Sequence, residues 1–383
     1  MTETSFIGKT GWILTAILVF SLTYTVSAES GQYPVIIMVK DIQTKENLDG
    51  ARVYFDGGYL GNTTSSSQNG IVVIQDVSPG VHTVRVIRQG YNEMTRKFVF
   101  PNETTVEIMI SKGSLVSLNQ EGPSPHAINI VFYPSSTSYN CTDHEKIPSP
   151  EYMSNETLFR ENVLDIINTT YMNLDHVTSP ADSLPEHYQK KFNFYYYYDP
   201  SSPADAFSSC PGSLPKSYWN NVTFSDVTVI LYPTYYGRYA NTSCQPMGCT
   251  RILGPGCSQM KVPADQEMLV THETGHAAFG LVDTYCGDTH YWQNDPYPNV
   301  WESLESCRAD ARSYDRDPEQ CRRIESGGSF SRNCIRNFWH WDPVPDIMTS
   351  MYGRFGDAAT QRIRFVLLKA GSDVSSQPGD GQP

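Results

Sequence analysis

The sequence has few positive charges and no run of them. Its 383 residues include 28 lysines and arginines against 41 aspartates and glutamates, a formal net charge of −13. Nucleic-acid binding needs clustered positive charge, so the composition argues against this class of function. Charged residues make up only 18% of the chain, whereas 39% is hydrophobic and 12% is aromatic. The chain can therefore bury a substantial core, and its low charge is typical of an extracellular protein.

Long apolar runs are absent after the first thirty residues, so no later segment is long enough to span a bilayer. The single run, Trp12–Leu22, follows Lys9 and precedes Val26-Ser27-Ala28. This pattern predicts a secretory signal peptide over residues 1–28 that is cleaved after Ala28. An uncleaved signal anchor is the alternative. We expect a secreted, extracellular protein without a stable membrane span after cleavage.

Cysteine is absent from the first 140 residues and frequent after them. The nine cysteines are Cys141, Cys210, Cys244, Cys249, Cys257, Cys286, Cys307, Cys321 and Cys334. In an oxidising compartment they predict disulfides with one thiol left over, and the absence of C-x-x-C spacing argues against a structural zinc knuckle. Seven Asn-x-Ser/Thr sequons predict a glycoprotein. They begin at Asn62, Asn102, Asn140, Asn155, Asn168, Asn221 and Asn241.

The cysteine-free part reads as a series of short strands. Apolar residues alternate with polar ones in His82–Arg88 and Thr104–Ile110, which is the period of a half-buried strand. Further strands are expected at Pro34–Lys40, Ala51–Phe55, Ile71–Gln75 and Met94–Phe100. We therefore predict a small all-β sandwich over residues 33–111. The stretches Tyr54–Gly58 and Pro79–Val86 resemble carboxypeptidase-regulatory-like and PEGA-type modules of secreted proteins. We expect an accessory or adhesive domain, with a cell-surface glycan as its candidate partner.

A second domain is predicted over residues 126–370, after a linker at 112–125 and before a disordered tail at 371–383. It begins with a buried strand at Ala127–Tyr133 and continues with a helix near Leu158–Met172. Two more strands follow at Phe192–Tyr198 and Asp226–Tyr232, and then a helix that Asp265 could cap. This order predicts an α+β fold in which a mixed sheet packs against helices.

The last of these helices carries His272-Glu273-Thr274-Gly275-His276. Residues i and i+4 lie on one helix face, so both imidazoles can bind one Zn²⁺ at about 2.1 Å. Glu273 can take a proton from a zinc-bound water and return it to the leaving amine. Gly280 follows where a left-handed residue would end the helix, and Asp283 comes three residues later. Two histidines on an ordinary helix face are the alternative.

The segment from His272 to Tyr285 resembles the extended zinc motif of metzincin metallopeptidases, closest to the IgA-peptidase-like branch. That branch has Gly-Leu-x-Asp-Glu-Tyr after His-Glu-x-x-His and three further residues. Here Thr284 replaces the usual Glu, and Val282 stands where a third His would be in the commonest spacing. The resemblance implies a metzincin-like domain with one catalytic Zn²⁺ bound by His272, His276 and Asp283. Other candidates for the third ligand are His290, His340, Glu302 and Glu305.

A metzincin also needs a methionine in a tight turn beneath the metal. Asp346–Tyr352 fits this requirement, with Met348 preferred and Met351 as the alternative, although methionine also fills ordinary core gaps. Tyr285 and Tyr352 could stabilise an oxyanion, but a buried structural role is favoured for each. The tryptophans between Gly287 and Pro345 either line substrate pockets or pack among disulfides.

These features predict a secreted zinc-dependent metalloendopeptidase that hydrolyses peptide bonds of a protein or peptide substrate. Two alternatives stay open. One is an extracellular surface-binding protein with an inactive zinc domain, and the other is a zinc hydrolase of a non-peptide substrate. The sandwich could also act as a propeptide, with an Asp rather than a Cys facing the zinc because it contains no cysteine.

Overall fold

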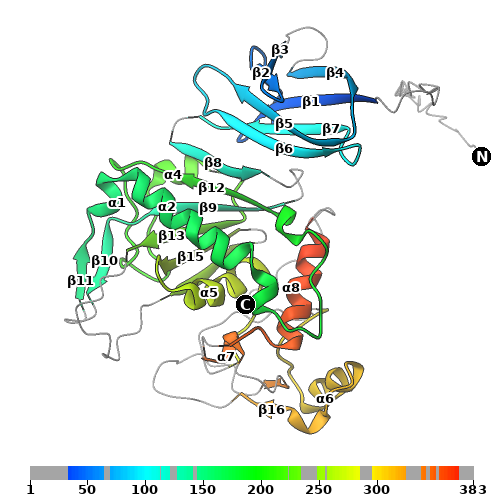
Figure 1. Ribbon diagram of the computed structural model, residues 1–383. Coiled ribbons are helices and arrows are strands. Elements are labelled where there is room, and N and C mark those ends of the chain that lie inside the picture. The colour runs from blue at the N-terminus through cyan, green and yellow to red at the C-terminus, as the bar shows by residue number, and fades with distance from the viewer. Residues whose placement is uncertain are drawn as a thin grey trace, which may run out of the picture.

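A computed structural model describes twelve segments of the chain, which contain two connected parts (Figure 1). The described residues are 33–63, 70–112, 114–120, 127–140, 145–222, 224–233, 248–254, 257–284, 296–324, 338–341, 346–350 and 353–370. The predicted signal peptide and the predicted C-terminal tail lie outside them.

The first part is a sandwich of two small sheets, as the alternating sequence predicted. Strand order is β4-β1-β7 in one sheet and β3-β2-β5-β6 in the other. Alternate residues of β1, namely Val35, Ile37 and Val39, are fully buried in the core between the sheets. The strands are β1 (Tyr33–Asp41), β2 (Arg52–Phe55), β3 (Gly58–Asn62), β4 (Ile71–Val77), β5 (Gly80–Ile87), β6 (Met94–Phe100) and β7 (Thr105–Ile110). Strand β3 was not anticipated.

The second part is built on a six-stranded mixed sheet in the order β14-β15-β13-β9-β12-β8. The four inner strands are parallel to one another, and the two edge strands β8 and β14 run antiparallel to their neighbours. The strands are β8 (Leu115–Gln120), β9 (Ile128–Pro134), β12 (Phe192–Tyr197), β13 (Val227–Tyr232), β14 (Cys249–Gly254) and β15 (Cys257–Pro263). The predicted α+β class with an N-terminal β domain is confirmed.

Residues 112–125 were expected to be a linker, and this expectation was wrong for the middle of the segment. Strand β8 occupies Leu115–Gln120 and pairs with β12 at the sheet edge. Backbone pairing with β12 supplies hydrogen bonds that a solvated linker would make with water. The chain therefore leaves the sandwich directly into the larger sheet.

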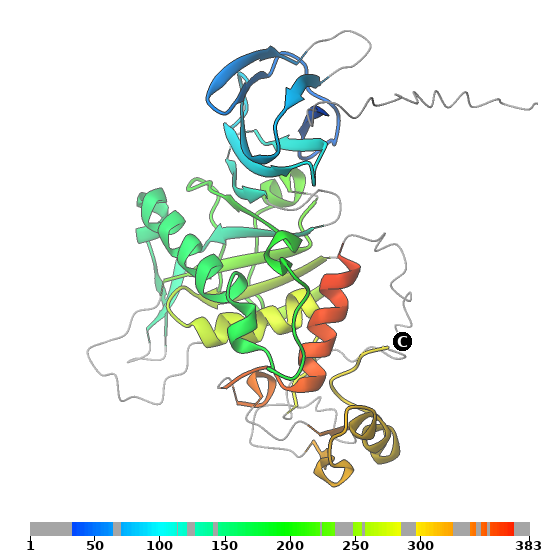
Figure 2. The same ribbon diagram turned by 45° about the vertical axis from the view of Figure 1, so that its right-hand side comes forward.

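The two faces of the larger sheet are covered by different layers. Ile130 and Phe132 of β9 point to one face and pack in the main core with the helices. Val131 and Tyr133, the alternate residues, point to the other face. The helices packed against the first face include α2 (Glu156–Ile166), α5 (Glu267–Phe279) and α8 (Asp357–Lys369), as Figures 1 and 2 show.

The sandwich contacts the opposite face of this sheet. Ile42 and Met109 belong to the same buried cluster as Val131 and Tyr133. The ammonium of Lys45 lies 5.3 Å from the centre of the Phe224 ring, a cation–π contact between the two parts. The N-terminal part lies beyond the β8 edge of the sheet, as Figure 1 shows, and adds Ile42 and Met109 to the cluster on this face.

The helix predicted near Leu158–Met172 is α2 followed by a π-helical turn, η1 (Ile167–Tyr171). Tyr171 is fully buried beneath α5, where its hydroxyl lies 3.0 Å from Thr274 Oγ1. Helix α5 begins after Gln266, which makes no side-chain cap bond, so the expected cap by Asp265 was wrong. Among the described residues, no helix combines the length and the apolar character needed to cross a bilayer.

The described residues of 296–324 and 338–341 form a small lobe below the sheet (Figure 1). Its cysteines Cys307 and Cys321 form a disulfide that packs with Trp301 and Trp341. This favours a packing role for these two tryptophans over a pocket-lining one. The lobe contains α6 (Leu304–Ser313), η3 (Pro318–Gln320), β16 (Arg322–Arg323) and β17 (Trp339–His340), and α7 (Ile347–Ser350) precedes α8. The remaining elements are β10 (Thr137–Asn140), β11 (Glu145–Pro148), α1 (Glu151–Ser154), α3 (Leu174–Val177), η2 (Tyr188–Lys191) and α4 (Lys216–Asn221).

Candidate metal centre

The C-terminal end of α5 is shaped by Gly280, which adopts φ +66°. This left-handed conformation is available to glycine at little cost and reverses the chain. The amide of Gly280 donates to His276 O and the amide of Leu281 donates to Gly275 O, each at 3.0 Å. The reversal brings Asp283 back beside the last turns of the helix, as the sequence predicted.

The structure brings His272, His276 and Asp283 together. The two Nε2 atoms lie 3.3 Å apart, and Asp283 Oδ1 lies 3.4 Å from that of His272 and 3.2 Å from that of His276. Ligand atoms bound to tetrahedral zinc at about 2.0–2.1 Å lie about 3.3–3.4 Å from one another. The three side chains are at most 12% exposed. The two Nε2 atoms and Oδ1 therefore have the spacing of three corners of a tetrahedron around a zinc ion.

Backbone carbonyls orient both imidazoles. Nδ1 of His272 lies 2.9 Å from Ile347 O, and Nδ1 of His276 lies 2.7 Å from Leu281 O. Because a carbonyl only accepts, each Nδ1 carries a hydrogen and each neutral ring presents the lone pair of Nε2 to the cluster. Such outer contacts are typical of histidines that bind metals.

In the ion-free cluster the two histidines have opposite pKa shifts. Burial and the neighbouring His276 lower the pKa of His272 to about 4, despite the opposing charge of Asp283. Burial also acts to lower the pKa of His276, but the charge and hydrogen bond of Asp283 outweigh it and raise this pKa to about 9. Near neutral pH, without an ion, His276 therefore carries a proton on Nε2 as well as on Nδ1, whereas His272 is neutral.

Glu273 is buried beside the cluster. Burial raises the pKa of its carboxyl to about 7, against the opposing effects of His276 and of a hydrogen bond from Thr250. Thr250 lies in the edge strand β14, and its Oγ1 donates to Oε2 of Glu273 at a distance of 2.5 Å. A Cβ on Gly248 would lie 2.3 Å from Oε1, so only glycine lets the backbone approach this carboxylate so closely. A carboxyl with a pKa near the working pH suits proton transfer.

Met348 is fully buried against α5, where its sulfur faces Gly275, a residue that lies between the two histidines along the chain. A Cβ on Gly275 would lie 2.9 Å from its sulfur, so this glycine makes room for the methionine. The amide of Thr284 donates to Met348 O at 3.0 Å, and the hydroxyl of Thr284 hydrogen-bonds that of Thr349. Thr284, whose replacement of Glu had no explanation from sequence, thus ties the loop of Asp283 to the Met348 turn.

Of the described residues, only His272, His276 and Asp283 gather as a group of metal-ligating side chains. Among the alternatives for the third ligand, His340 and the exposed Glu302 and Glu305 are not part of this group. His290 lies outside the described residues, as do Tyr285, Met351 and Tyr352.

Sequence reasoning missed three residues around this cluster, Gly248, Thr250 and Asn299. The stretch with Cys244, Cys249 and Cys257 was expected to be rich in loops, but Thr250 lies in β14 and Gly248 directly precedes it. The Cys210–Cys249 disulfide ties this strand to the chain after β12. Asn299 hydrogen-bonds the backbone of Val282, next to Asp283. Neither Thr250 nor Asn299 belongs to a periodic pattern, so no signal in one sequence marks them.

The sequence family described as PEGA domain matches residues 42–113. The match covers most of the predicted sandwich, residues 33–111, and agrees with its resemblance to PEGA-type modules. It covers less than half of the chain, so it characterises the N-terminal part only. A comparison with curated proteins found no match.

Solved structures similar to this chain include pilins. The group B streptococcus pilus 2b backbone protein matches with 17% identity and a TM-score of 0.19, over 23% of this chain and 43% of that one. A streptococcal ancillary pilin matches with 16% identity and a TM-score of 0.18, over 21% and 30%. The major pilin subunit of Bacillus cereus matches with 13% identity and a TM-score of 0.18, over 28% and 35%. The chain thus spans less than half of each pilin, and scores this low carry no argument.

Proposed function

We propose that this protein is a secreted zinc-dependent metalloendopeptidase with a metzincin-like catalytic domain. The observation that carries the proposal is the triangle of His272 Nε2, His276 Nε2 and Asp283 Oδ1, whose edges of 3.2–3.4 Å match those of tetrahedral zinc. The Gly280 reversal and the buried Met348 turn support the same interpretation. The two described disulfides are compatible with an extracellular location.

In this proposal the residues divide the chemistry between binding and proton transfer. A bound zinc ion would supply Lewis-acid activation of water and of the scissile carbonyl. Glu273 accepts a proton from the attacking water and returns it to the amine that leaves. Thr250 holds the carboxylate of Glu273 by donating to Oε2. The Nδ1 hydrogens of His272 and His276 face carbonyls, so both residues would bind the ion through Nε2, and His276 would first lose its Nε2 proton.

Strand β14 favours a peptide substrate over other hydrolysable groups. It is an edge strand, and among the described strands β15 is its only partner. An extended peptide can pair with the open side of such a strand through backbone hydrogen bonds. Because Thr250 of β14 contacts Glu273, a peptide paired there would pass beside the proposed base.

The test uses the full exported chain, loaded with zinc and assayed on casein and fluorogenic peptides. We expect cleavage that a chelator abolishes and that added zinc restores. Glu273→Gln should keep the bound zinc and lose activity by about 100-fold or more, since it removes the proton acceptor. Zinc-loaded protein without chelator-sensitive cleavage would favour the alternative of a surface-binding protein, and normal cleavage by Glu273→Gln would refute the assignment of the base.

A further inference from the structure

Asn299 makes two hydrogen bonds with the backbone of a single residue, Val282. Its Oδ1 accepts from Val282 N at 3.0 Å, and its Nδ2 donates to Val282 O at 2.6 Å. The Asn299 side chain is buried, with 2% of the residue exposed. One amide therefore satisfies both backbone groups of the residue that precedes Asp283, where water could not.

These two bonds fix the two peptide planes that lead into Asp283. The N–H of Val282 shares a plane with the carbonyl of Leu281, which accepts from His276 Nδ1 at 2.7 Å. The carbonyl of Val282 shares the next plane with the amide of Asp283. Rotation of either plane would break a buried hydrogen bond, and it would also swing the carboxylate away from the imidazoles.

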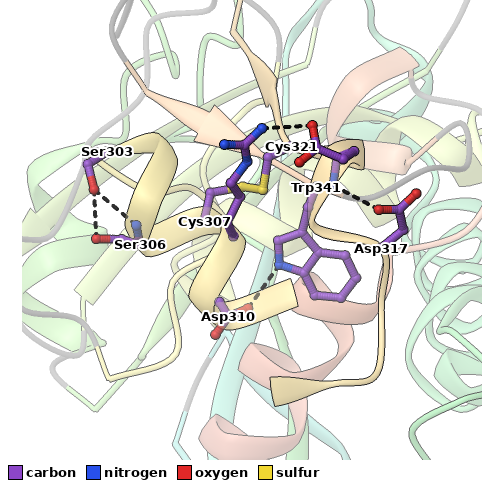
Figure 3. The surroundings of a disulfide bond; sticks show 9 residues. Ser303, Ser306, Cys307, Asp310, Asp317, Cys321 and Trp341 are labelled. Atoms are coloured by element: carbon purple, nitrogen blue, oxygen red, sulfur yellow. Dashed lines mark hydrogen bonds and ion pairs between the residues drawn. A yellow bond between two sulfur atoms is a disulfide. The ribbon is translucent and has the colours of Figure 1, made fainter. Parts of the chain in front are cut away.

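Asn299 is also anchored by residues outside the loop that it holds. Val300 is fully buried and packs against Val282 and Ile324. The next residue, Trp301, exchanges two backbone hydrogen bonds of 2.8 Å with Trp339. Trp301 also belongs to the core of the disulfide-bonded lobe, part of which Figure 3 shows around Cys307 and Trp341. The position of the amide is therefore set by the lobe.

We propose that Asn299 is a positioning residue that holds the carboxylate of Asp283 in the geometry of a metal ligand. The inference rests on the proposed zinc site and extends it, because it makes the C-terminal lobe part of the support for that site. Ligands that are already oriented bind an ion more tightly than ligands that must be ordered by it, and loss of an outer contact commonly weakens metal binding by about 10–100-fold.

The test is a double-mutant cycle on the zinc affinity of the full exported chain, measured by competition with a chromogenic chelator. Asn299→Ala should weaken zinc binding about tenfold or more in the otherwise unmodified protein. In an Asp283→Ala background the same substitution should weaken zinc binding by less than about threefold, because the carboxylate that Asn299 positions is gone. An equal loss in both backgrounds would overturn the proposal, since it would show an effect that does not pass through Asp283.

Asn193→Ala is the matched control for loss of a buried amide. Asn193 is 1% exposed on β12, and its Nδ2 donates to Asn129 Oδ1 rather than to the ligand loop. This control should lower the free energy of unfolding and leave the zinc affinity unchanged. If Asn299→Ala does not fold, Asn299→Ser, which retains a shorter polar group, takes its place in the same cycle with the same expectation.

The outcomes for this inference and for the proposed function differ. If the unmodified protein binds zinc and Asn299→Ala binds it equally well, only the role of Asn299 is refuted. If the unmodified protein binds no zinc, the proposed function is refuted and the role of Asn299 with it. Weaker binding by the Asn193→Ala control, to the same extent as by Asn299→Ala, would also overturn the positioning role.

Discussion

Zinc binding should release one proton near neutral pH, and it should weaken as the pH falls. In the ion-free protein the pKa of His276 is about 9 and that of His272 is about 4. Between these values His276 carries a proton that must leave before its Nε2 can bind the ion, whereas His272 is already neutral. The apparent dissociation constant should therefore rise about tenfold for each unit by which the pH falls from 8 to 6, or about 3 kcal/mol in total.

The measurement is made in the unmodified protein and repeated in Glu273→Gln protein, which also loses one of the charges that raise the pKa of His276. The pKa of the Glu273 carboxyl is about 7, so this group would add a second titration in the same range. Chelator competition at pH 6, 7 and 8 gives the slope, and calorimetry in buffers of different ionisation enthalpy counts the released protons. A slope near zero would refute the protonated state of His276, and a slope near two would show that both imidazoles are protonated.

Asp283→Asn provides the internal control. Burial acts to lower the pKa of His276, and the charge and hydrogen bond of Asp283 are the largest of the effects that raise it, ahead of the Glu273 charge and the Leu281 carbonyl. Without the charge of Asp283, His276 should be neutral at pH 7, so the variant should bind zinc more weakly but with little dependence on pH between 7 and 8. If this variant keeps the pH dependence of the parent, the source assigned to the shift is wrong.

Three further predictions concern stability. Gly248→Ala should lower the free energy of unfolding by about 1–3 kcal/mol in urea titrations, because its Cβ would overlap the Glu273 carboxylate, whereas Gly58→Ala, with 3.4 Å to its nearest neighbour, should change it less. Burial acts to lower the pKa of His82, but the Asp56 carboxylate and the Ser78 carbonyl raise it above 6.5 overall. The protonated ring therefore stabilises the sandwich below pH 6.5, by less than about 1 kcal/mol because Asp56 is half exposed. This contribution should disappear as the pH rises through the raised pKa, and His82→Gln should remove that change in the urea midpoint. Ile42→Ala should lower the free energy of unfolding by about 2–5 kcal/mol and destabilise the larger sheet as well as the sandwich, because Ile42 lies in a cluster shared by both. Two transitions in calorimetry, of which only one shifts, would contradict this shared core.

The parts of the structure that the sequence predicts are those with a local cause. Alternation along β5 and β7 places their apolar residues on one face, and this pattern predicted the sandwich. The helical period places His272 and His276 one turn apart, and Gly280 reverses the chain toward Asp283. Each of these relations spans at most a dozen residues, so a single sequence contains the information.

The remaining parts depend on contacts between distant segments. Strand β8 is polar enough to resemble a linker, and it becomes a strand because the edge of β12 is available for pairing. Thr250 reaches Glu273 across 23 residues and Asn299 reaches Val282 across 17, without any periodic relation. Such contacts follow from the tertiary arrangement, which neither propensity nor spacing determines.

The position of β8 also defines where this chain could exchange modules with other proteins. A recombination boundary placed after residue 125 would transfer Leu115–Gln120 with the donor sandwich and leave the recipient sheet without its edge. A boundary near residue 112 would keep the sheet whole, but the incoming module would still need apolar side chains where Ile42 and Met109 now lie. Domain shuffling at this junction is therefore restricted to modules that bring a matching surface, and the two parts are expected to be inherited together.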